Sequence, residues 1–211
     1  MSLACVDQTH GTQQHRAESW LQAAKQYQQD PDIHYITLWI SLCACANMPE
    51  SQQSRFGERV GFQQYVAKLV RCDEGELARI VWEAYPNTIR GLLDNPYVWD
   101  SFWRAQREQE SWEEAFGRER KRASRYFKER NIEALLVMVF DRLATLRNQM
   151  LFGGATYKSR VNRVQIYDAA ELLGELVPAV LAIMKLHPEE DWGTVHYPVM
   201  NRTEATTEGT L

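Results

Sequence analysis

Residues 132–157 read IEALLVMVFDRLATLRNQMLFGGATY and predict a long helix that ends at a pair of glycines. Its apolar residues recur at i, i+3 and i+4 spacing, the pattern of a helix that buries one face: Leu135, Leu136, Val139, Phe140, Leu143 and Leu146. Asn131 is a suitable N-cap, and Gly153-Gly154 end the helix after Leu151. Arg147, Asn148 and Gln149 therefore arrive together just before the chain turns, where they could hold a phosphate.

Helical patterns continue in both directions from this segment. Apolar spacing predicts helices over residues 17–29, 32–47, 56–70, 74–84, 88–93 and 165–185, whereas strand signals are weak. The 32–47 segment is apolar nearly all round, which is typical of a helix in the middle of a bundle. The predicted fold class is therefore an all-α helical bundle.

Length and composition set the expected domain organisation. With 211 residues and 45% apolar composition, the chain can bury one substantial core. We expect an N-terminal extension over residues 1–16, a single domain over 17–200 and a disordered tail over 201–211.

Charge and targeting signals narrow the class of protein. A net charge of -4 argues against a protein that coats nucleic acid through bulk positive charge, although it leaves room for a local basic cleft. The first ten residues lack the pattern of a secretory signal, and no apolar run is long enough to cross a membrane. The four cysteines include no C-x-x-C pair and are expected to be buried thiols. We therefore predict a cytoplasmic protein without membrane contact.

The segment from Arg147 to Tyr157 resembles a motif of the HEPN superfamily, in one of its bacterial branches. Supporting similarities are Val161-Asn162-Arg163, Trp192-Gly193, Tyr197-Pro198-Val199 and, upstream, residues 35–41. The resemblance extends from about Trp20 to Val199. It implies an all-α bundle that forms a homodimer and brings two copies of the motif to a shared cleft. Active members are metal-independent endoribonucleases of toxin–antitoxin, phage-defence or RNA-processing systems, so no cofactor or metal is expected, and RNA, an antitoxin or another protein are the implied partners.

The motif of active members consists of an arginine, a polar residue and a histidine four to six residues after the arginine. The guanidinium neutralises the scissile phosphate, and the imidazole moves protons at the 2′-hydroxyl or the leaving oxygen. Arg147 and Asn148 match the first two positions, but Phe152 stands at the histidine position. Since phenylalanine cannot transfer a proton, cleavage is expected to be absent or severely impaired. Phe152 itself is expected to fill a dimer interface or, alternatively, to stack on an RNA base.

Basic residues offer two candidate RNA contacts. Lys158, Arg160 and Arg163 follow the motif directly and would line the same cleft. The run from Arg118 to Arg130 is either a solvated helix face or a strip that contacts RNA phosphates. The Trp99, Phe102 and Trp103 cluster is expected in the core. His187 and His196 flank an acidic stretch but lack a spacing typical of metal ligands.

Two functional hypotheses follow. The first is an RNA-binding protein with a ribonuclease fold and little or no turnover. The second is a non-catalytic dimeric module that binds a protein or a nucleotide-like ligand.

Overall fold

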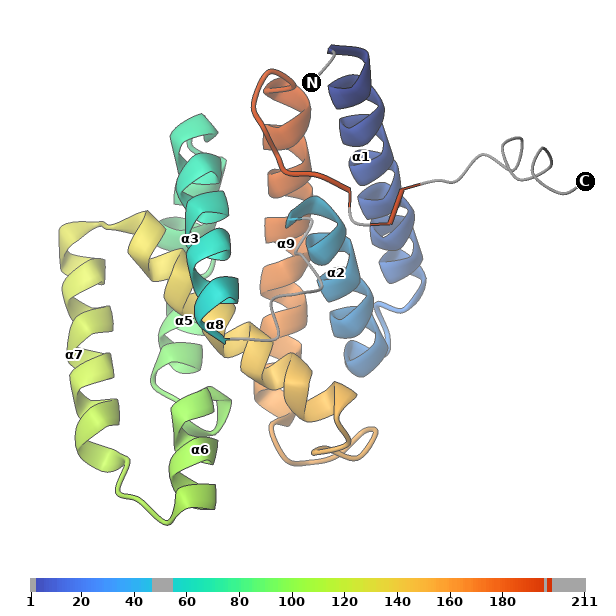
Figure 1. Ribbon diagram of the computed structural model, residues 1–211. Helices are drawn as coiled ribbons and strands as arrows, with labels where there is room; N and C mark the ends of the chain where they lie inside the picture. Colours follow the sequence, from blue (N-terminus) through green and yellow to red (C-terminus); the bar gives the residue numbers. More distant parts are fainter. Residues whose placement is uncertain (1–2, 47–54, 196, 199–211) are drawn as a thin grey trace, which may run out of the picture.

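The computed structural model describes residues 3–46, 55–195 and 197–198, and the regular structure in these ranges is entirely helical (Figure 1). The prediction of an all-α bundle is therefore confirmed. The α-helices are α1 (Leu3–Gln26), α2 (Pro31–Ala46), α3 (Arg55–Cys72), α4 (Glu76–Arg79), α5 (Pro86–Leu93), α6 (Asp100–Glu108), α7 (Glu113–Glu129), α8 (Ile132–Leu151) and α9 (Arg163–Leu186). A π-helical turn, η1 (Ile80–Ala84), follows α4, and a 3-10 turn, η2 (Pro96–Val98), precedes α6.

The main core is built from buried side chains of several helices, including α1, α2, α3, α5, α8 and α9. The predicted apolar face of α8 is buried, and so is most of α9 from Ile166 to Met184. The Tyr35 hydroxyl on α2 donates a hydrogen bond to the Leu143 carbonyl of α8 at 2.5 Å. Ser41 donates to the Ala17 carbonyl at 2.6 Å and so joins α2 to α1. These buried bonds fix the rotation of α2 against both neighbours.

A second, smaller apolar cluster lies beside the main core. Trp99, Phe102 and Phe116 are buried together between α6 and the start of α7. Trp103 is the exception to the expected core cluster, because its side chain is 37% exposed and its indole N–H donates to the Tyr97 carbonyl at 2.8 Å. An indole beside an available carbonyl can satisfy its polar end at the surface.

Two helix predictions need correction. The first helix begins at Leu3 and not at Ala17. Buried Gln13, whose amide donates to the Trp192 carbonyl at 3.3 Å, belongs to this extra length and gives no apolar signal. The segment expected as one helix over 74–84 changes to a π-helical turn at Ile80, where the Tyr85 N–H reaches the Ile80 carbonyl at 2.9 Å.

Other predictions concern the C-terminal tail, the cysteines and membrane-spanning helices. The tail expected over 201–211 and His196 lie outside the described residues. Cys45 and Cys72 are buried as expected, and Cys43 is half-buried. In the ranges that the structure describes, each helix is too short or too polar to cross a membrane.

Candidate functional site at the C-terminal end of α8

Arg147 lies on the last turns of α8, against α2. Its guanidinium carbon is 4.9 Å from the centre of the Trp39 ring, and the side chain is half-buried. The Arg147 Nε is buried and has no hydrogen-bond partner among the described residues. Stacking on Trp39 holds the guanidinium in one plane at the C-terminal end of the helix, where a positive charge is also favoured by the helix dipole.

Phe152 is the C-cap of α8, and its side chain is 80% exposed. Its backbone N–H donates to the Asn148 carbonyl at 3.0 Å, so the backbone of Asn148 helps to close the helix. The chain turns through Gly153, which has a φ of 72°, and then through Gly154, where an added Cβ would lie 3.1 Å from the Gln149 carbonyl oxygen. The two glycines therefore allow the turn that leaves Phe152 projecting from the end of the bundle.

Gln149 fastens the loop after α8 to two other elements. Its amide nitrogen donates to the Tyr97 carbonyl at 2.6 Å, and its amide oxygen accepts from the Asn162 side chain at 2.8 Å. Asn162 is the N-cap of α9 and adopts a left-handed conformation with φ 55°, which asparagine tolerates better than most residues. These bonds join the end of α8 to η2 and to the start of α9.

Two of the three basic residues predicted to bind RNA are held by carboxylates. Arg163 Nη1 lies 2.5 Å from Asp32 Oδ2, and Arg163 Nε donates to the Ser159 carbonyl at 2.9 Å. Lys158 Nζ lies 3.4 Å from Asp30 Oδ2. Arg160 is exposed and has no ion pair among the described residues. The local positive charge available to a phosphate is therefore smaller than the sequence suggests.

Asp30 receives a second contact from the loop. The Tyr157 hydroxyl donates a hydrogen bond to Asp30 Oδ2, and this bond is the main reason that the pKa of Asp30 is lowered. The start of α2 therefore presents two carboxylates, at positions 30 and 32, to the segment that follows α8. Together they pair with cations that would otherwise face solvent.

Exposed apolar side chains surround this end of the molecule. Between residues 151 and 167, at the junction of α8 and α9, the following side chains are exposed by 51–80%: Leu151, Phe152, Tyr157, Val161, Val164 and Tyr167. We call these six residues the apolar patch. Figure 1 shows that their segment forms one end of the bundle, away from α7. Such a concentration of exposed apolar surface is typical of an interaction site.

Several arginines of the basic run on α7 are exposed and paired with carboxylates. Arg118 pairs with Glu114, Arg122 with Glu119, and Arg120 with Asp94, at 2.7 Å in the last case. The three arginine side chains are about half exposed or more. The run does not extend toward the apolar patch, because α7 adjoins the beginning of α8 and the patch lies at its end.

Two of the described histidines have other hydrogen-bond partners. His34, near the start of α2, places Nδ1 2.8 Å from the Ala24 carbonyl of α1. His187 ends α9, at the opposite end from the patch, and places Nδ1 3.1 Å from Glu189 Oε1. Within the described ranges there is also no group of three His, Cys, Asp or Glu residues placed to hold a metal ion.

Several residues that shape this site were not predicted as part of it. Asp30 and Asp32 appear in the sequence as the ends of a helix-breaking Asp-Pro-Asp segment, and Trp39 as a core residue. Trp39 contacts Arg147, and the two aspartates contact Lys158 and Arg163, across long separations in the sequence. Acidic residues separated from the loop by more than a hundred positions carry no local signal of pairing.

Comparison with known proteins does not assign the chain to a family. No protein-family model, curated protein or solved structure matches it significantly.

Proposed function

We propose that the chain is a non-catalytic interaction module with a HEPN-like architecture, and that it forms a homodimer through the apolar patch. The observation that carries this proposal is the exposure of six apolar side chains in the segment that follows Arg147, which the resemblance assigns to the dimer cleft. A two-fold interface pairs the same patch on both subunits, so a single self-complementary apolar surface is sufficient.

The chemistry of the site favours interaction over catalysis. Phe152 offers no proton donor or acceptor, and Lys158 and Arg163 are paired with Asp30 and Asp32. An active ribonuclease site needs a group that titrates near neutrality next to the phosphate-binding cation. Arg147 alone supplies charge without acid or base.

RNA binding is a second candidate because of two cations. Arg147 has a buried Nε without a partner among the described residues, and Arg160 is exposed. In a homodimer both would be present twice around one cleft. RNA bound there would be held through its phosphates and would be released by salt.

Substitutions that add polarity at the patch test the proposal. Phe152→Ser and Val164→Ser each remove one exposed apolar contact and are expected to shift the dimer toward monomer in sedimentation velocity runs. Leu186→Ser is the matched control, because Leu186 is 64% exposed on the far end of α9. Equal sedimentation of all four proteins would place the interface elsewhere and contradict the proposal.

A further inference from the structure

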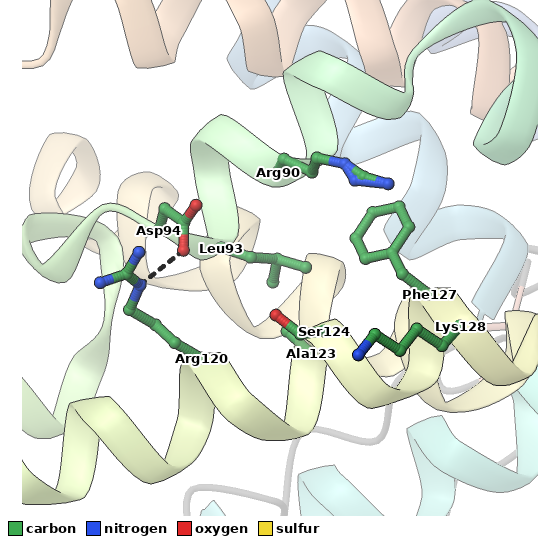
Figure 2. A pocket seen from close by; sticks show the side chains of 8 residues that line it. All are labelled: Arg90, Leu93, Asp94, Arg120, Ala123, Ser124, Phe127 and Lys128. Carbon is green, nitrogen blue, oxygen red and sulfur yellow. Dashed lines mark hydrogen bonds and ion pairs between the residues drawn. The ribbon is translucent and has the colours of Figure 1, made fainter.

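A cavity of about 330 Å³ lies between α5 and α7, remote from the apolar patch. Figure 2 shows its lining: Arg90, Leu93 and Asp94 from α5 and its C-cap face Arg120, Ser124, Phe127 and Lys128 of α7. Residues 120, 124 and 128 are four apart and so share one face of α7. The cavity is within the size range of sites for small ligands.

Arg90 is oriented in this cavity by an aromatic ring. Its guanidinium carbon lies 4.0 Å from the centre of the Phe127 ring, and the ring in turn meets Trp82 edge-on at 5.8 Å. No carboxylate pairs with Arg90 among the described residues. Because the donors of a guanidinium lie in its plane, stacking on one face leaves them available for a bidentate anion.

Lys128 and Ser124 add to the same cavity. In Figure 2 the Lys128 ammonium extends along α7 toward the Ser124 hydroxyl, below the Arg90 side chain. Lys128 has no ion pair among the residues that the structure describes. The one carboxylate in the lining, Asp94, is 2.7 Å from Arg120 Nε and so is already matched by a cation. The lining therefore carries three cations against one anion.

The apolar part of the lining indicates that a bound anion should carry an apolar or planar portion. Leu93, Ala123 and Phe127 form the apolar part of the lining, alongside the charged side chains. An inorganic ion would contact the cations and leave these side chains facing water. A ligand with a phosphate and an apolar or planar portion would use both parts of the lining.

We propose that this cavity binds a phosphate ester of about mononucleotide size, with Arg90 and Lys128 as the phosphate ligands. Asp94 would limit the affinity, because it repels the phosphate and holds Arg120 away from it. The site is independent of the proposed dimer, since it uses no residue of the apolar patch.

Isothermal titration at low ionic strength tests the site, with AMP, adenosine and inorganic phosphate as probes. AMP is expected to bind, and adenosine and inorganic phosphate to bind more weakly. Arg90→Gln and Lys128→Ala should each weaken AMP binding roughly tenfold, as expected for loss of a charged hydrogen bond. Lys128 is exposed, so Lys128→Ala should leave the melting temperature unchanged. If Arg90→Gln fails to fold, Lys128→Ala alone still tests the site.

Two further variants test whether AMP binding depends on the cavity itself or only on the positive charge of α7. Arg118→Ala removes the same charge from α7 outside the cavity and should leave AMP binding within about twofold, since an exposed charge acts weakly at a distance. Asp94→Asn should strengthen AMP binding. The proposal would be overturned by absence of AMP binding, by equal affinity for adenosine, by inorganic phosphate binding as tightly as AMP, or by an equal loss in Arg118→Ala and Lys128→Ala.

Discussion

Arg163, at the start of α9, forms an ion pair with Asp32, at the start of α2, and the Asp32 side chain is only 6% exposed. The second guanidinium nitrogen, Nη2, also reaches Asp32 Oδ1 at 3.3 Å, so the contact is bidentate. This pair connects the start of α9 to the start of α2. It gives Arg163 a structural role, whereas its contact with RNA stays a prediction.

Removal of Arg163 is expected to be costly. Arg163→Ala would leave the Asp32 carboxylate buried without a countercharge and should lower the free energy of unfolding by ~2–4 kcal/mol. Urea denaturation at a fixed protein concentration measures the change. Lys158→Ala is the control, because Lys158 is 61% exposed and solvent screens its pair with Asp30, so its loss should change stability much less. Equal effects of the two substitutions would contradict a structural role specific to Arg163.

The hydrogen bond from Tyr157 to Asp30 predicts a dependence of stability on pH. Because this bond lowers the pKa of Asp30 in the folded protein, its contribution is present above the unfolded pKa of about 3.9 and is lost as the pH falls through the lower, folded value. Tyr157→Phe should therefore reduce stability slightly at pH 7, since solvent screens an exposed hydrogen bond of this kind. Thermal melts from pH 7 down to pH 2 should show the difference shrinking below about pH 4. A difference that grows on acidification would exclude this bond as its cause.

Much of the fold could be predicted because its signals are local. The apolar spacing of residues 132–151, the N-cap Asn131 and the two glycines predict α8 with its observed limits. The start of α1 could not be predicted in this way, since buried Gln13 is polar and its partner Trp192 is distant in sequence.

The candidate site was predicted less completely than the fold. Arg147 and Phe152 were identified from the motif, but the pairing of Lys158 and Arg163 with the two aspartates depends on the packing of α2 against the loop. The cavity between α5 and α7 combines residues from two helices. In the sequence, each of these helices has the pattern of an ordinary amphipathic or charged segment, so the cavity was not predicted.

The phenylalanine at the histidine position of the motif predicts a defect in cleavage. The native chain should not cut a generic single-stranded RNA in the presence of EDTA, because Phe152 cannot transfer a proton. Phe152→His restores an imidazole at the motif position, and cleavage by this variant that is lost in the Phe152→His, Arg147→Ala double variant would support ribonuclease ancestry. Cleavage by the native chain that depends on Arg147 would show that another residue serves as acid or base.

The RNA-binding candidate makes its own prediction. If RNA is bound through phosphates at the dimer cleft, Arg160→Ala should weaken binding and reduce the slope of affinity against salt concentration by about one for each Arg160 that contacts a phosphate, and so by about two if both copies in the dimer do. Fluorescence anisotropy with labelled RNA between 50 and 200 mM salt, a range over which such contacts weaken strongly, measures both effects. An unchanged slope in Arg160→Ala would remove this residue from the RNA contacts.

The most direct test of the central claim is the mass of the native chain in solution. Sedimentation equilibrium at micromolar concentration should give about twice the 24.6 kDa mass of one chain, with Phe152→Ser shifted toward the single-chain mass. A native mass of 24.6 kDa over the whole concentration range would contradict the proposed homodimer.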